Sequence, residues 1–377
     1  MEINSVLQEI INQLVWIMAL ILVLLTVAML IFHALSQVSK ARRERIRRGI
    51  ASLLSEPAED AVTDQPAPVR SGQKHPESGQ PAPKALADFL AVPGICSRNG
   101  LQVLTKLPMS EPEIARIRMY ADAEPYRTYL HRSIAEKSKD TQLLVMKLTA
   151  RMRLHGFTED VERTVLRYRT DSDAQQIGLM SLFVNGDLEA ICRLFGMQDY
   201  KILLSFRQIM ELFYSYGGDT AVLYQRLLHM PTDVYVKRAC LQGIGSNHMT
   251  GMIGEVLPYL HSPDMNMQID AVRTVGILQY TGAEEVLLQL AEAPEWQLRQ
   301  TVADCLARLD MEKYYPVILK MLTDREWWVR FHAASALLKY EDRSRVLRDT
   351  AGLNDRFASE IISYMIEREA ILEGDVS

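Results

Sequence analysis

The chain lacks the residue patterns on which most catalytic and metal-binding sites are built. Its 377 residues contain no HExxH motif, no P-loop and no His/Cys cluster at metal-ligand spacing. The glycine-rich residues 243–254 follow an expected helix rather than a strand, which disfavours a dinucleotide-binding loop. The sequence therefore predicts no catalytic residue, no cofactor and no metal.

Cysteine is scarce, and strand-forming patterns are missing. None of the four cysteines belongs to a CxxC pair, so neither a disulfide framework nor a zinc site is expected, and a reducing compartment fits this usage. No segment alternates with the period of a strand, which predicts an all-α fold. The net charge of −5 favours no nucleic-acid partner.

Formal charge is absent from residues 15–35, which read VWIMALILVLLTVAMLIFHAL. As a helix this stretch would be about 31 Å long at 1.5 Å per residue, which matches a bilayer core of ~30 Å. No basic region precedes it and no small-x-small cleavage site follows it. We therefore expect a retained transmembrane helix rather than a cleaved signal peptide.

The charges beside this stretch predict its orientation. Residues 1–14 contain no Lys or Arg and form a short non-cytoplasmic N-terminus, whereas residues 36–54 form a basic juxtamembrane segment on the cytoplasmic side. This arrangement predicts a single-pass protein of a plasma or bacterial inner membrane. The basic side chains are also expected to contact anionic lipid headgroups: Lys40, Arg42, Arg43, Arg45, Arg47 and Arg48.

A proline-rich segment separates the basic residues from the rest of the chain. Residues 55–87 contain six prolines and no aromatic residue, so we expect a disordered linker that leashes the cytoplasmic domain. Ordered structure should resume near residue 88, with residues 88–169 forming a helical N-terminal part. Ser110 and Glu113 have capping-box spacing. Four helices are expected there, over 111–121, 125–137, 141–154 and 158–169.

A motif that returns every 31 residues organises the second half of the chain. Its apolar anchors are Val236, Met267, Leu298 and Val329, and apolar residues also stand four and eight positions after each anchor. This spacing places them on one stripe of a helix. An acid precedes each anchor by three positions: Asp233, Asp264, Glu295 and Glu326. The position directly after the anchor is basic in three of the four repeats: Lys237, Gln268, Arg299 and Arg330.

A second apolar helix precedes each anchor, so each repeat should be a hairpin of two antiparallel helices. A fixed period of this length is the signature of a solenoid. Four clear repeats and two degenerate ones predict a repeat region over 170–351, closed by a C-terminal helical cap over 352–377.

The acid-x-x-[VL]-R-x-x-x-[VA] pattern resembles the HEAT repeat, and more closely the HEAT-like repeats first described in phycobilin lyases. The resemblance is carried by Glu295–Leu306 and Glu326–Leu337. It implies an all-α, HEAT-like α-solenoid in which the acids and arginines form a hydrogen-bonded structural ladder. Lys237 matches the pattern in part, and Gln268 departs from it, so that rung should be weaker.

Tryptophans at the turns are the candidate partner-binding residues. Trp296, Trp327 and Trp328 begin the second helix of two adjacent repeats, and Phe331 lies one turn further on. Neighbouring aromatic residues on one edge of a solenoid are suited to anchor a partner. Packing of the turn is the alternative, and it is favoured for Trp296 and Trp327.

These features favour a membrane-tethered cytoplasmic scaffold that is not an enzyme and that binds another protein, itself membrane-associated. In a bacterium such a scaffold would suit an envelope assembly for polysaccharide synthesis or secretion. A HEAT-like enzyme of the lyase type and a ligand-responsive regulatory module are the alternatives.

Overall fold

The computed structural model describes residues 2–55 and 81–374. In these ranges the chain is helical and contains no β-strand, which confirms the predicted all-α class. The chain divides into two compact units, Met1–Arg167 and Tyr168–Ser377. Most of the predicted linker, 55–87, lies outside the described residues.

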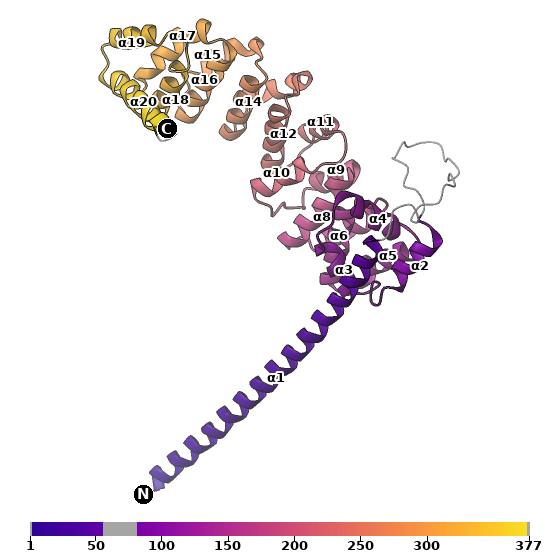
Figure 1. The fold of residues 1–377 in the computed structure, drawn as a ribbon. Helices are drawn as coiled ribbons and strands as arrows, with labels where there is room; N and C mark the ends of the chain where they lie inside the picture. The colour runs from indigo at the N-terminus through magenta and orange to yellow at the C-terminus, as the bar shows by residue number, and fades with distance from the viewer. Residues whose placement is uncertain (1, 56–80, 375–377) are drawn as a thin grey trace. The chain divides into compact units, whose positions relative to one another are not determined.

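Helix α1 (Glu2–Ser55) runs unbroken through the predicted span and the basic segment after it (Figure 1). Its stretch beginning at Ile21 is long and apolar enough to cross a membrane, with a mean hydropathy of 2.3. Every residue from Ile21 to Leu35 is exposed. A helix that is apolar on all sides needs an apolar surrounding, and the protein itself does not supply one to this part of α1.

The C-terminal part of α1 packs into the first unit. Ile46 and Ile50 are 1% and 0% exposed. Gly49 allows the close approach, because a Cβ at this position would lie 3.0 Å from the Cγ1 of Val92. The guanidinium of Arg116 donates hydrogen bonds of 3.3 Å to the carbonyls of Leu53 and Leu54. The end of α1 is therefore part of the folded unit.

This docking includes the end of the expected basic segment, residues 36–54, in the folded unit. The sequence suggested that folded structure begins near residue 88, with a flexible connection to the membrane segment. Instead, α1 continues from the apolar stretch into the domain, and α2 begins at Pro83. Basic residues surround Ile46 and precede Ile50 in the sequence, so the local pattern does not indicate the apolar contact that these two side chains make.

The other helices of the first unit pack around this end of α1. Ser110 and Glu113 form the predicted capping box at the start of α4, and the four helices expected between residues 111 and 169 are present as α4 to α7. The bounds are α2 (Pro83–Ala91), α3 (Arg98–Lys106), α4 (Glu111–Asp122), α5 (Tyr126–Glu136), α6 (Lys139–Met152) and α7 (Thr158–Arg167).

The second unit is a solenoid of helical hairpins. Helices α14, α16, α18 and α20 form one row, and α15, α17 and α19 form the row beside it (Figure 1). Its first part contains α8 (Ser172–Asn185), α9 (Leu188–Gly196), α10 (Phe206–Tyr214) and α11 (Thr220–His229). Next come α12 (Val234–Ser246), α13 (Ile253–Val256), α14 (Met265–Ile277), α15 (Glu284–Leu290), α16 (Trp296–Leu309), α17 (Met311–Lys320), α18 (Trp327–Leu337), α19 (Arg343–Gly352) and α20 (Arg356–Gly374). Short 3₁₀ turns lie at Thr250–Met252, Leu257–His261, Thr281–Ala283 and Met321–Thr323.

The predicted apolar stripe is the core of this solenoid. The four anchors are 0–7% exposed, and the residues four and eight positions later are fully buried. These residues lie on α12, α14, α16 and α18, and each of these helices packs against the next. The 31-residue period thus describes one row of helices that bury a shared face.

Of the basic residues in the motif, Arg299 has a carboxylate partner in the structure, and that partner is not a motif acid. Glu295 and Glu326 precede α16 and α18, but neither side chain caps its helix. Arg299 instead reaches forward to Asp324, with Nε–Oδ2 at 2.7 Å and Nη2–Oδ1 at 2.8 Å. The carboxylate partner therefore stands two residues before the acid that the motif suggested.

The other members of the motif have mixed roles. Asp233 and Asp264 cap their helices, each accepting a hydrogen bond from a backbone N–H. Arg299 and Arg330 also donate to backbone carbonyls in the turn before their helices, with nitrogen–oxygen distances of 2.7 to 3.1 Å. Gln268 makes one such bond, to the carbonyl of Leu260 at 2.8 Å. The side chain of Lys237 lies over the Tyr259 ring, with Nζ 6.0 Å from its centre.

We expect Ile50→Ala to lower the unfolding free energy of the first unit by about 2–4 kcal/mol, because a fully buried side chain leaves a cavity. Val38→Ala is the control, since Val38 is 51% exposed on the same helix. Thermal denaturation of the detergent-solubilised chain measures both variants. Equal stability of the two would contradict the docking of α1.

We expect Arg299→Ala to destabilise the solenoid by about 3 kcal/mol, because it strands a half-buried carboxylate and two carbonyls. Gln268→Ala removes a single neutral hydrogen bond and should cost about 1 kcal/mol. Burial alone would raise the pKa of Asp324, but hydrogen bonds from Arg299 and from the backbone N–H of Glu326 hold it below its usual value.

A depressed carboxylate pKa adds stability that is present above the unfolded-state pKa and is lost as the pH falls through the folded-state pKa. The difference in unfolding free energy between the wild type and Arg299→Ala should therefore become smaller below about pH 4. Denaturation at a series of pH values measures this difference. A difference in unfolding free energy that stays constant down to pH 2 would show that the ion pair with Asp324 adds no stability.

Candidate protein-binding surface

The structure gathers exposed aromatic side chains at the start of α18. Trp327 and Trp328 are its first two residues and are 40% and 50% exposed. Their ring centres lie 4.8 Å apart, and that of Phe331 lies 5.0 Å from Trp327. Three of the four predicted partner-binding residues therefore form one cluster. The fourth, Trp296, is half-buried at the start of α16, and no ring contact joins it to the cluster among the described residues.

Helix α20 extends this cluster with residues that the motif did not indicate. The ring centre of Tyr364 lies 6.3 Å from that of Trp327, and Tyr364 and Phe357 are 48% and 56% exposed. A cavity of about 180 Å³ separates α18 from α20 here and is lined by Trp327, Arg330, Phe357, Glu360, Ile361 and Tyr364. We call Trp327, Trp328, Phe331, Phe357 and Tyr364 the aromatic patch.

Two arginines lie against the aromatic patch. The guanidinium carbon of Arg330 lies 5.0 Å from the ring centre of Phe357, and that of Arg368 lies 5.5 Å from the ring centre of Phe331. Cation–π contacts of this kind hold the rings in place while they remain exposed. Arg330 thus serves both the internal ladder and the surface.

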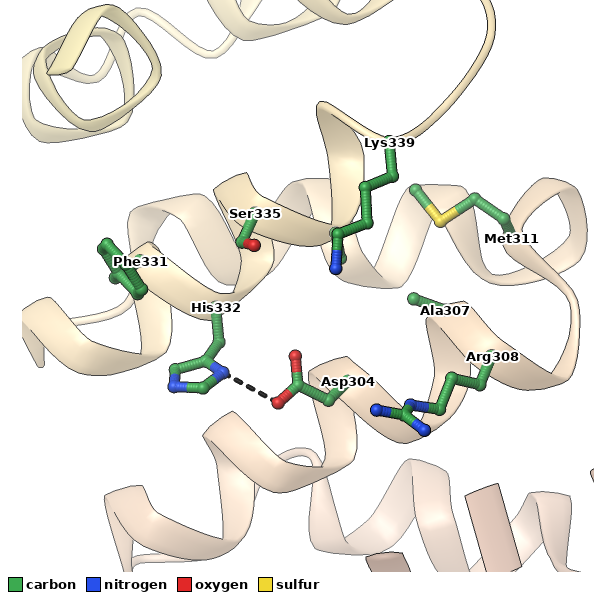
Figure 2. A pocket seen from close by; sticks show the side chains of 9 residues that line it. Asp304, Ala307, Arg308, Met311, Phe331, His332, Ser335 and Lys339 are labelled. Atoms are coloured by element: carbon green, nitrogen blue, oxygen red, sulfur yellow. Dashed lines mark hydrogen bonds and ion pairs between the residues drawn. The ribbon is translucent and has the colours of Figure 1, made fainter. Parts of the chain in front are cut away.

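A groove between α16 and α18 adjoins the aromatic patch through Phe331 (Figure 2). Its volume is about 390 Å³, and it is lined by Asp304, Ala307, Arg308, Met311, Phe331, His332, Ser335, Ala336 and Lys339. Arg308 and Lys339 border it as cations, whereas Met311 and Phe331 supply apolar surface. The groove can therefore receive an apolar side chain together with an acidic group.

The groove also contains a histidine–aspartate pair, with Nδ1 of His332 2.7 Å from Oδ2 of Asp304. Ser335 shares the groove, which raises the possibility of a nucleophilic triad. Figure 2 shows the second ring nitrogen of His332 pointing away from the Ser335 hydroxyl. The described residues therefore do not form the serine-to-histidine hydrogen bond that such a triad needs.

The repeat register gives this pair a structural role. Asp304 stands six residues after its anchor, and His332 stands three residues after the next anchor. Gln242 and Asp270 occupy the same two positions on α12 and α14 and are hydrogen-bonded at 2.9 Å. The two pairs are thus equivalent links between successive helices. The same positions hold Arg273 and Thr301 between α14 and α16, so the residue types in these two columns do not predict the contact from the sequence.

The cysteines offer no reactive group at this surface. Cys305 is buried on α16, and burial raises the pKa of its thiol to about 12, which keeps the thiol protonated at neutral pH. In the described parts of the chain, no group of three or more His, Cys, Asp or Glu residues could hold a metal ion. This surface presents aromatic and charged side chains.

We expect Trp328→Ala to change the stability of the solenoid by less than about 1 kcal/mol, because half of the side chain is exposed. Val329→Ala, at the neighbouring buried anchor, should cost about 2 kcal/mol. Thermal denaturation of both variants measures the difference. If Trp328→Ala lowers the unfolding free energy as much as Val329→Ala does, the Trp328 ring packs the turn and is not available to a partner.

Comparison with known proteins supports the repeat assignment. The family model of HEAT repeats matches residues 283–351, and no curated protein matches the chain. Among solved structures, the chain is similar to an engineered protein at 16% identity, over 77% of this chain and 81% of that chain, with a TM-score of 0.31. It is also similar to the complex of CpcE and CpcF of phycocyanin lyase from Nostoc sp. PCC7120 at 15% identity, over 78% of this chain and 99% of that chain, with a TM-score of 0.27.

Identities and TM-scores this low transfer neither a fold nor an activity to this chain, so the assignment rests on the matched repeats and on the helical hairpins themselves. The residues matched by the family model span α15 to α19, which include the start of α18, the whole lining of the groove and the α18 side of the smaller cavity. Residues 283–351 are therefore HEAT repeats.

Proposed function

We propose that this protein is a membrane-anchored scaffold whose HEAT repeats bind another protein through the aromatic patch and the adjoining groove. The observation that carries the proposal is the exposure of Trp327, Trp328, Phe357 and Tyr364 together on α18 and α20. Large aromatic side chains supply most of the binding energy at protein interfaces. Exposed apolar clusters of this size on a soluble surface mark interaction sites.

The chemistry of the surface indicates the kind of segment that it would receive. Arg308 and Lys339 border the groove, and Arg368 lies over Phe331. An acidic segment with one or two large apolar side chains would satisfy both the cations and the rings. Such a segment could bury its apolar side chains between α18 and α20 and place its carboxylates toward the groove.

The anchor determines where this surface would meet its partner. The apolar stretch of α1 supports a single span, and the cations that follow it favour a cytoplasmic location for the remainder of the chain. Anchoring raises the effective concentration of the scaffold for a partner in the same membrane. We therefore propose a membrane-associated partner within an envelope assembly, such as one for polysaccharide synthesis or secretion.

We expect Trp328→Ala to abolish co-purification of the partner from detergent-solubilised membranes of the native organism, with mass spectrometry identifying what is lost. Tyr235→Ala is the matched control, because Tyr235 precedes its anchor by one residue on α12, as Trp328 does on α18, and is 46% exposed. The control should retain the partner. If both variants keep the same partners as the wild type, the aromatic patch is not the binding surface.

A further inference from the structure

A basic groove lies where α1 leaves the predicted membrane span. It has a volume of about 540 Å³ and lies between α1 and the end of α3. Three cations of α1 and one of α3 line it, together with a single carboxylate. The lining is Lys40, Arg43, Glu44, Arg47, Gln102, Val103, Lys106, Leu107 and Pro108. Its formal charge is +3, which favours an anionic ligand.

Only half of the basic residues predicted to meet lipid line this groove. Lys40, Arg43 and Arg47 are spaced three and four residues apart and share the face of α1 that meets α3. Arg42, Arg45 and Arg48 are exposed elsewhere on the helix. The structure therefore separates two sets of cations that the sequence could not distinguish.

Hydrogen bonds between α1 and α3 fix the two walls of the groove relative to each other. Arg43 is half-buried, and its Nη1 donates to Oε1 of Gln102 at 3.0 Å. One turn closer to the span, Oγ of Ser39 donates to Oδ1 of Asn99 at 3.3 Å. Because these bonds fix α3 against α1, Lys106 is held near the α1 cations before any ligand arrives. A preformed site loses less entropy on binding than a flexible one.

Glu44 is the one acid in the lining. Its carboxylate lies 3.8 Å from Nη1 of Arg47 and 3.4 Å from Nε of Arg48. Arg47 is therefore already paired with an anion. Lys40, Arg43 and Lys106 supply the positive charge that remains for a ligand.

The position along α1 relates the groove to the membrane surface. Lys40 follows Leu35, the last residue of the predicted span, by five residues, or about 7.5 Å along the helix axis. The polar layer of a bilayer is about 5–8 Å thick on each side. Lys40 therefore lies at the level of the headgroups, and the groove extends from there away from the hydrocarbon.

We propose that this groove binds the phosphate-bearing headgroup of an anionic phospholipid. Lys40 and Arg43 would contact the phosphate from α1, and Lys106 would contact it from α3. Charge-assisted hydrogen bonds from such groups are shorter and stronger than neutral ones. The inference rests on the membrane anchorage in the proposed function, and it adds a headgroup site that fixes the first unit against the membrane surface.

The test uses the full-length protein and compares two variants that each lose two charges. Lys40→Gln with Lys106→Gln removes exposed lysines from the groove. Arg42→Gln with Arg45→Gln removes exposed arginines outside it. Each protein is reconstituted in nanodiscs of phosphatidylcholine with phosphatidylglycerol. Native mass spectrometry after mild detergent extraction then counts the retained phosphatidylglycerol.

We expect the groove variant to bind phosphatidylglycerol at least about tenfold more weakly than the wild type, and the control variant to change less than about twofold. Equal losses in the two variants would overturn the proposal, because the attraction would then be general electrostatics. Titration with inorganic phosphate and glycerol 3-phosphate tests the source of the phosphate group. Binding of either one as tightly as the lipid would overturn the assignment to a lipid headgroup.

Extraction of the membranes with alkaline carbonate tests the anchorage separately. If the protein remains in the membrane but does not select phosphatidylglycerol, only the proposed headgroup site is contradicted. Protein that is released contradicts the anchorage on which both proposals rest. Thermal denaturation of both variants verifies that they fold like the wild type.

Discussion

The second unit depends on one constraint, which is that each repeat can bury its apolar stripe only against the next repeat. The helices α12, α14, α16 and α18 carry that stripe, and each packs against its successor. The polar contacts follow from this stacking. Arg299 can reach Asp324, and Gln242 can reach Asp270, because the stack places these residues side by side on adjacent repeats. The aromatic patch then forms where α18 meets α20, near the end of the stack.

The sequence predicted those parts of the structure that repeat. Anchors such as Val236 and Val329 could be recognised because the same contact recurs every 31 residues. Prediction from the sequence failed for contacts that occur only once in the structure. Ile50 packs into the first unit although it closely follows a run of arginines, so its local pattern indicated a membrane flank. Phe357 and Tyr364 lie beyond the clear repeats, and no period indicated that α20 would place them beside Trp327.

The candidate site shows the same division. The sequence singled out the tryptophans at the turns as candidates, with packing favoured for Trp296 and Trp327, and the structure leaves Trp327 and Trp328 exposed. The residues that surround the tryptophans could not be predicted, because they depend on how α16, α18 and α20 pack. The sequence did not identify the acid that pairs with Arg299, for a related reason. Glu326 and Asp324 are both near the turn, and only the three-dimensional path decides which carboxylate faces Arg299.

The unbroken course of α1 has a mechanical consequence. Helix α1 is unbroken between the apolar stretch and the buried Ile46, so if that stretch spans a membrane as proposed, the first unit follows any tilt or rotation of the helix. An α-helix turns by about 100° and rises 1.5 Å with each residue. For the proposed span, the number of residues between Leu35 and Ser39 therefore sets the direction in which the first unit faces around the helix axis.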